Sequence, residues 1–346
     1  MAIMSRRPWN RIAVVGLALL ITASMLGQST PSAAADVSAV RTIRLSVDNP
    51  PGNDRAAVEQ KFAQLVGQLS HGRLQVQIYF SGSLGGSETT AIQSVKAGGA
   101  EMAIVGTANF SGIDNRWSMF DLPFLFAGPA GLYKYMQAAE FAQLVNSTVE
   151  RDGLRYVFPY YDGWRQLVTT KKQVLNLAEE ANLKLRATAS PAEIAYDKAF
   201  GAKPVSVAWN EVYLALKQGL VDGLMIGYTD LIDFKMGDAV GYGTTLNVAP
   251  ELVCGFMREA YFAALPKDLQ QAVVAAGRQT DIFAQQDNRR EEAAARTTLR
   301  AGGMKIYDPP ANVRQQWVSA AQPVYANFRE ILSEKQQASI QQIAGH

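Results

Sequence analysis

Histidine and cysteine are almost missing from this sequence. Its 346 residues include only two histidines, His71 and His346, and one cysteine, Cys254. A histidine-based catalytic triad, a Cys–His pair and a zinc site all need these side chains, so the sequence offers almost nothing for such chemistry. A single thiol also excludes a disulfide within the chain. We therefore expect no metal site and no cofactor, and much of enzymology is excluded.

A large excess of charge of either sign is also lacking. The 33 basic and 31 acidic residues give a formal net charge of +2, and no long basic run occurs. The electrostatic signature of a nucleic-acid-binding protein is therefore absent. Hydrophobic residues make up 48% and charged residues 18%, which is typical of a folded chain with a sizeable core. The length suggests about two domains.

Long hydrophobic runs are missing as well, apart from a short one near the N-terminus. The run Ile12–Leu26 follows a basic stretch and precedes the small residues Ala33–Ala35. This order predicts a signal peptide over residues 1–35 and a periplasmic protein without direct membrane insertion. A retained anchor is the alternative, but the run is shorter than the ~20 residues of a spanning helix. The basic residues of the stretch are Arg6, Arg7 and Arg11.

The rest of the chain alternates strand and helix patterns. Apolar residues at helical spacing occupy Arg55–Leu69, and a second helix is predicted over Glu88–Lys96. Strands that alternate with helices predict βαβ units, and so an α/β fold with a parallel sheet. The predicted strands are Thr42–Val47, Leu74–Phe80, Met102–Val105, Tyr156–Phe158, Leu167–Thr170, Lys184–Arg186 and Gly223–Ile226.

One later segment is unusually long for a helix. From Asp268 to Arg300 the chain contains no proline, and Gly277 is its only helix breaker. One interpretation is two helices that meet at Gly277. The other is a single helix of about 50 Å that is shared by two lobes. Lobes that share several chain crossings can close over a ligand by hinge motion.

Three kinds of site can be considered. The loop Ser81–Ser87 precedes a helix and could hold an anion, but it lacks the Lys-Ser/Thr of a P-loop and is better explained as a turn. Carboxylates such as Glu211 and Asp222 could serve an exported hydrolase, although such residues also act as caps. Arg165 and Arg186 stand at the start and the end of predicted strands, where a guanidinium could bind a carboxylate with two parallel hydrogen bonds.

Longer stretches carry a family resemblance. Leu84–Phe126, Lys184–Gly223 and Leu265–Gln270 resemble the substrate-binding proteins of tripartite ATP-independent periplasmic (TRAP) transporters, of the dicarboxylate-binding type. The most specific pieces are FDLPFLF at Phe120–Phe126 and the run Glu211–Gly223. The resemblance extends over nearly the whole chain after residue 35.

The resemblance implies a two-lobed α/β periplasmic binding protein with hinge strands and a long helix bracing both lobes. Lobe I would comprise residues 36–162 and 252–291, and lobe II residues 163–251 and 292–346. The implied function is capture of a small organic acid and its delivery to the membrane subunits of a TRAP permease, without catalysis. A binding protein that serves a signalling receptor is the alternative, and an exported hydrolase is a more distant one.

The resemblance also implies a ligand site. Arg186 matches the family's carboxylate-binding arginine, Arg165 an assisting arginine, and Trp209 an aromatic residue that packs against the ligand. By looser alignment Asp48 and the backbone of Gly106 and Thr107 would line the opposite lobe. The remaining predicted lining residues are Ile226 and Val253.

Departures from the family pattern affect the expected ligand. After Val221-Asp222-Gly223, many members of the family continue with Gln-Glu-Asn-Pro, whereas this chain has Leu224–Gly227. One polar contact with the ligand is therefore missing. Ala189 and Val253 stand where sugar-acid binders of the family carry polar side chains. A buried hydroxyl without a partner costs ~1–3 kcal/mol. The sequence therefore predicts an apolar pocket for an acid with an aliphatic, keto or aromatic body.

Overall fold

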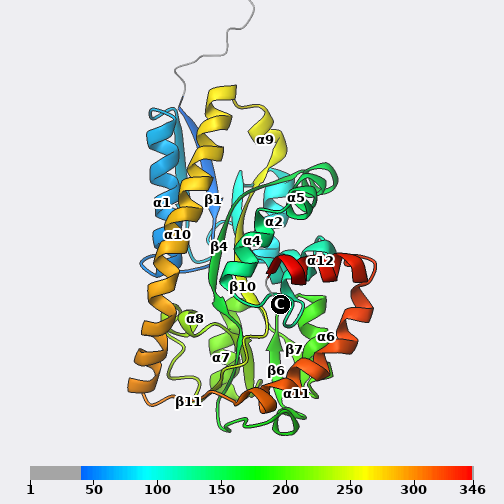
Figure 1. The fold of residues 1–346 in the computed structure, drawn as a ribbon. Coiled ribbons are helices and arrows are strands. Elements are labelled where there is room, and N and C mark those ends of the chain that lie inside the picture. Colours follow the sequence, from blue (N-terminus) through cyan, green and yellow to red (C-terminus); the bar gives the residue numbers. More distant parts are fainter. Residues whose placement is uncertain (1–39, 345–346) are drawn as a thin grey trace, which may run out of the picture. The chain divides into compact units, whose positions relative to one another are not determined.

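The computed structural model describes residues 40–344, except the side chains of residues 287–291 and 344 (Figure 1). The predicted signal peptide, residues 1–35, lies outside the described residues. Within them, no helix combines the length and the apolar character needed to cross a membrane.

Five strands form the first sheet, in the order β2-β1-β3-β10-β4. Its predicted strands β1 to β3 are present and run parallel, while β10 is antiparallel to both of its neighbours. The strands are β1 (Arg41–Ser46), β2 (Leu74–Tyr79), β3 (Met102–Gly106), β4 (Leu154–Trp164) and β10 (Pro250–Arg258). The associated helices are α1 (Asp54–Leu69), α2 (Glu88–Ala97), α3 (Thr107–Phe110), the 3-10 helix η1 (Asn115–Asp121), α4 (Pro129–Met136), α5 (Ala139–Asp152) and α9 (Glu259–Ala263).

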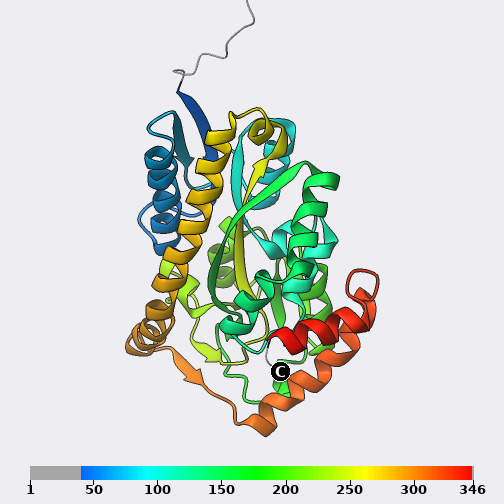
Figure 2. The same ribbon diagram turned by 45° about the horizontal axis from the view of Figure 1, so that its top comes forward.

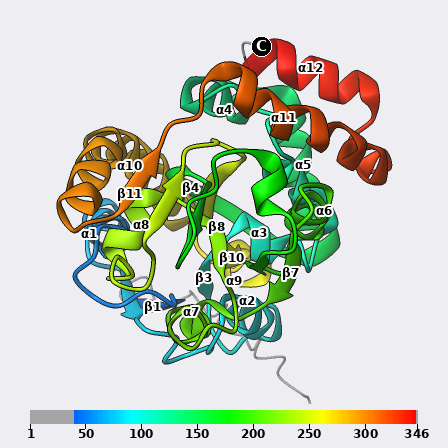
Figure 3. The same cartoon turned by 90° about the horizontal axis from the view of Figure 1, so that it is seen from below.

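Six strands form the second sheet, in the order β11-β9-β5-β8-β6-β7. Figure 3 shows α8 and α10 on one side of its strands and α6 on the other. The strands are β5 (Gln166–Thr169), β6 (Lys184–Ala187), β7 (Lys203–Ser206), β8 (Gly223–Ile226), β9 (Tyr242–Thr244) and β11 (Lys305–Tyr307). The helices are η2 (Leu177–Glu180), α6 (Pro191–Ala199), η3 (Trp209–Glu211), α7 (Val212–Gln218), α8 (Tyr228–Asp233), α10 (Lys267–Ala301), α11 (Ala311–Ala321), η4 (Gln322–Phe328) and α12 (Glu334–Ala344).

The α/β class is confirmed, but the predicted parallel sheet is replaced by two sheets that mix parallel and antiparallel pairs. Strand β5 is antiparallel to β8 and β9, just as β10 is antiparallel to β3 and β4. The cause is the way the chain passes between the sheets. Only Arg165 separates β4 in the first sheet from β5 in the second. Likewise, β10 enters the first sheet only a short segment, residues 245–249, after β9 has left the second. These direct passages are the expected hinge strands.

The long helix is continuous. Helix α10 has 35 residues and contacts α1 and β4 beside the first sheet and α8 and β11 beside the second (Figure 2). Gly277 does not interrupt it. A Cβ atom at Gly277 would lie 2.5 Å from the carbonyl oxygen of Val157 on β4, so glycine is required there for close packing of the helix on the sheet. The single-helix interpretation is correct.

The sequence motif Phe120–Phe126 belongs to the core of the first half. Phe120, Leu122 and Leu125 are fully buried, and the carbonyl of Pro123 accepts a 2.7 Å hydrogen bond from the hydroxyl of Tyr325 in η4. The motif therefore joins η1 to the C-terminal helices, and its role is structural.

The contact at Gly277 gives a first prediction. Replacing Gly277 by alanine should lower the free energy of unfolding by about 1–3 kcal/mol, because the added methyl group forces α10 away from β4. Gly302→Ala at the exposed end of the same helix meets nothing closer than 3.4 Å and serves as the control. Urea unfolding of the three proteins tests this. Equal stability of Gly277→Ala and the parent protein would contradict the packing argument.

Candidate functional site

Side chains from both halves of the chain line one small cavity of about 30 Å³. The lining combines three arginines and several acids with an apolar surface. Its residues are Arg55, Glu88, Gly106, Ala108, Asn109, Arg165, Arg186, Thr188, Trp209, Met225, Ile226, Asp230, Glu251 and Val253.

Most of the predicted site residues meet at this cavity. Those that line it are Arg186, Arg165, Trp209, Gly106, Ile226 and Val253. Asp48 and Thr107 are not among the lining residues. Thr107 is buried as the first residue of α3, and burial together with the neighbouring Glu88 raises the pKa of Asp48 to about 7.

Arg186 is a buried cation without a counter-ion. It lies near the end of β6 and is only 4% exposed. Its Nε donates a 3.0 Å hydrogen bond to the carbonyl of Val207, and its guanidinium carbon lies 5.5 Å from the centre of the Trp209 ring. Among the described residues, no carboxylate lies within 4.0 Å of it. Burial lowers the pKa of Arg186, as expected for a cation removed from water.

Arg165, in contrast, is already paired. Its position between β4 and β5 places the guanidinium among acids from three elements, and it is only 2% exposed. Nη1 donates to Glu193 Oε2 at 2.8 Å, Nε lies 3.0 Å from Glu251 Oε2, and Nη2 lies 3.6 Å from Asp121 Oδ1. The predicted contact of Arg165 with a ligand stays a prediction.

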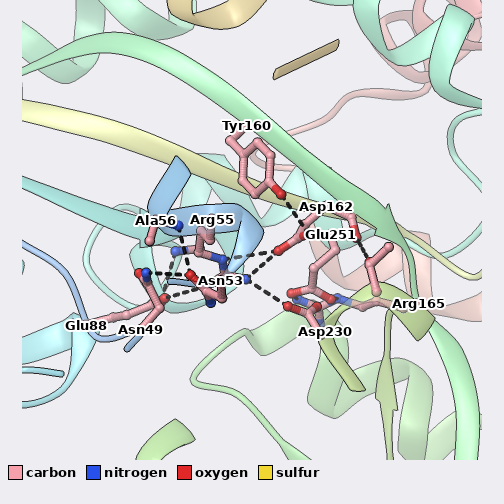
Figure 4. A network of polar contacts seen from close by, with 12 residues as sticks. Asn49, Asn53, Arg55, Ala56, Glu88, Tyr160, Asp162, Arg165, Asp230 and Glu251 are labelled. Carbon is pink, nitrogen blue, oxygen red and sulfur yellow. Dashed lines mark hydrogen bonds and ion pairs between the residues drawn. The ribbon is translucent and has the colours of Figure 1, made fainter. Parts of the chain in front are cut away.

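A third arginine, Arg55, connects the two halves of the structure (Figure 4). It comes from the first turn of α1, and its Nη2 donates to Asp162 Oδ2 on β4 at 2.7 Å and to Asp230 Oδ1 in α8 at 3.0 Å. All three side chains are at most 7% exposed. Burial and the adjacent charge of Asp162 raise the pKa of Asp230 well above its usual range. The two carboxylates therefore share one cation, Arg55.

Glu88 occupies the part of the cavity formed by the first half. Its Oε2 accepts hydrogen bonds from the backbone N–H of Gly106 at 2.9 Å and from Asn109 Nδ2 at 2.7 Å. Asn109 Oδ1 in turn accepts a 3.3 Å hydrogen bond from the backbone N–H of Ala189, across the cavity. The turn that ends at Ser87, the N-cap of α2, thus places a carboxylate here. This favours the turn interpretation of the Ser81–Ser87 loop over the anion-binding one.

The prediction of an apolar pocket is wrong for part of the wall. Met225, Ile226 and Val253 supply apolar surface, as expected from the departures in the motif. Ala189 is not among the lining residues. Arg55, Glu88, Asn109, Thr188, Asp230 and Glu251 add a polar surface that the sequence did not reveal. A ligand with hydroxyl groups therefore finds partners here.

The chain resembles known proteins over most of its length. It is 24% identical over 270 residues to the 2,3-diketo-L-gulonate-binding periplasmic protein YiaO of Escherichia coli, which is 78% of each chain. It superposes with a TM-score of 0.83 and 20% identity on the sugar acid binding protein DctPAm of Advenella mimigardefordensis in complex with galactonate, covering 88% of this chain and 98% of that one. A TRAP periplasmic solute-binding protein of Sulfurospirillum deleyianum with bound succinate gives a TM-score of 0.82 at 24% identity, covering 88% and 99%.

The two α/β halves are joined by short chain passages between their sheets and line one cavity, an arrangement that suits a solute-binding protein. Residues 50–331 match the bacterial extracellular solute-binding protein family 7 (DctP), and the chain belongs to this family. The resemblance to TRAP substrate-binding proteins is thereby confirmed, and so is a role in transport.

The Arg55 cluster gives the second prediction. Arg55→Met should lower the free energy of unfolding by about 3–5 kcal/mol, because it leaves two buried acids without their cation. Asp230→Asn should cost less than about 1.5 kcal/mol, since the amide oxygen can still accept from Arg55 and Asp162 remains beside the guanidinium. Urea unfolding at pH 7 measures both changes. Equal losses for the two variants would show that Asp162 alone does not neutralise Arg55 and would contradict this argument.

Proposed function

We propose that this protein captures a small organic acid in the periplasm by its carboxylate and delivers it to the membrane subunits of a TRAP permease. The observation that carries the proposal is the Arg186 guanidinium, which is buried in the cavity wall without a carboxylate partner among the described residues. A buried cation is costly unless an anion pairs with it. A ligand carboxylate supplies that anion, and the guanidinium matches its geometry with two parallel hydrogen bonds.

The ligands of the relatives support an acid as the captured solute. The name of the E. coli relative refers to diketo-gulonate, and the two structural neighbours contain galactonate and succinate. All three molecules carry at least one carboxylate, and they differ in length and in their number of hydroxyl groups. A carboxylate is therefore the group that these ligands share and that a binding site can recognise in all of them.

Binding without catalysis is part of the proposal. Glu211 and Asp222, which were considered for a hydrolase, are not among the residues that line the cavity. Asp222 accepts a 2.9 Å hydrogen bond from the backbone of Lys184, and Glu211 is exposed in η3. Export to the periplasm would use residues 1–35 as a signal peptide.

The third prediction concerns Arg186. A thermal-shift screen of organic acids first identifies a ligand, since a ligand at 100 times its Kd adds ~2.7 kcal/mol to stability. In calorimetry with that acid, Arg186→Ala should lose at least about 3 kcal/mol of binding, because an anion would be desolvated without a partner. Arg186→Lys should recover little, since an ammonium lacks the planar fork.

The exposed Arg329→Ala is the matched control for this experiment and should bind as the parent protein does. Less than a tenfold loss for Arg186→Ala would remove Arg186 as the anchor.

Closure around the ligand is the fourth prediction. We propose that residues 36–162 with 252–291 and residues 163–251 with 292–346 move as two lobes. The Arg55–Asp230 and Asn109–Ala189 contacts join these lobes, so an open form must lack them. Small-angle scattering should show a smaller radius of gyration when the identified acid is added at saturation. Identical profiles with and without the acid would argue against a closing cleft.

A further inference from the structure

The three arginines of the cavity differ in how far their charges are neutralised. Arg55 and Arg165 each lie within 3.0 Å of two carboxylates. Arg186 has no carboxylate within 4.0 Å among the described residues. The cavity wall therefore holds a single cation whose charge is left for a ligand.

One carboxylate oxygen in the same wall also lacks a hydrogen-bond donor among the described residues. Glu88 Oε2 accepts two hydrogen bonds, from Gly106 and Asn109, whereas no hydrogen bond from a described residue reaches Oε1. The cationic atom facing Oε1 is Arg55 Nη1, at 4.0 Å, and the other nitrogens of Arg55 donate to Asp162 and Asp230. Glu88 lines the cavity from the first half, and Arg186 from the second. A bound molecule thus meets a free cation and a free hydrogen-bond acceptor.

We propose that the ligand is a monocarboxylate whose far end donates a hydrogen bond to Glu88, and that Glu88 discriminates against dicarboxylates. This rests on the capture of a carboxylate by Arg186 proposed above. It assigns to Glu88 the role of a specificity-determining residue.

The physical reason is the cost of a second charge. One carboxylate of a dicarboxylate would neutralise Arg186, and the other would be buried near Glu88, Asp230 and Glu251 without a free cation. Like charges that line one buried cavity repel each other strongly. A hydroxyl at the same place instead donates a charge-assisted hydrogen bond to Glu88 Oε1. The succinate-containing neighbour shows that this fold can hold a dicarboxylate. The side chains that line the cavity must therefore determine whether a dicarboxylate binds.

Acids that differ only at the far carbon test the proposal directly. Each pair has a terminal CH₂OH group in one member and a carboxylate in the other: glycerate and tartronate, 4-hydroxybutanoate and succinate, galactonate and galactarate. Calorimetry on the parent protein should give at least tenfold tighter binding of the hydroxy acid in every pair that binds.

The variant Glu88→Gln should shift this preference. Its amide oxygen can keep the hydrogen bonds from Gly106 and Asn109, while the NH₂ group takes the place of Oε1 and donates. The ratio of the two affinities should move at least tenfold toward the dicarboxylate. Glu150→Gln, on the exposed face of α5, makes the same chemical change outside the cavity and should leave the ratio unchanged.

The outcomes separate this proposal from the proposed function. If dicarboxylates bind the parent protein as tightly as their hydroxy partners, or if folded Glu88→Gln keeps the parent ratio, the role of Glu88 is overturned while carboxylate capture stands. If no acid in the pairs or in the wider screen binds, the proposed function fails, and the role of Glu88 fails with it. If Glu88→Gln does not fold, the relative affinities of the parent protein for the hydroxy acids and the dicarboxylates still test the proposal.

Discussion

The requirement that a buried positive charge be neutralised governs the organisation of this protein. Three guanidinium groups lie within the wall of one cavity, each at most 6% exposed. Two of them are neutralised by acids of the chain itself, and those ion pairs hold the elements around the cavity in place. The third, Arg186, has no such acid among the described residues. The same electrostatic cost that makes the first two pairs structural is the basis for proposing that the third arginine binds a ligand carboxylate.

The topology explains why the arginines meet. Arg186 lies at the end of a parallel strand, where side chains face the crevice between strands and helices. Arg165 is the single residue between β4 and β5, so the passage between the sheets carries it to the cavity. Arg55 follows the N-cap Asn53 of α1, at the edge where that helix faces the second half. Fixed backbone positions therefore bring together charges that are far apart in the sequence.

Local patterns were enough to predict the strands β1 to β3, the helices between them and Arg186 at a strand end, because each of these depends on short-range periodicity. Strand β10 was missed. It is buried on both faces along nearly its whole length, so Pro250–Arg258 shows no alternation of polar and apolar residues. The Arg55 cluster was missed for a different reason. Arg55 and Asp230 are 175 residues apart, and each looks locally like an ordinary charged residue of a helix. Only the fold shows that they are buried together.

The departure from the family motif at Leu224–Gly227 has a structural counterpart in that cluster. A Cβ atom at Gly227 would lie 3.1 Å from the carbonyl oxygen of Asp162 and 3.4 Å from Asp230 Oδ2, so the glycine allows β8 to end close to β4. This close approach helps Asp230 reach Arg55. Met225 and Ile226 meanwhile face the cavity with apolar surface. The polar groups next to this segment, Asp162 and Asp230, therefore form ion pairs with Arg55 between the two halves. On the cavity side this segment offers no polar contact, and the proposed recognition of the ligand therefore depends on Arg186 and on the polar residues of the opposite wall.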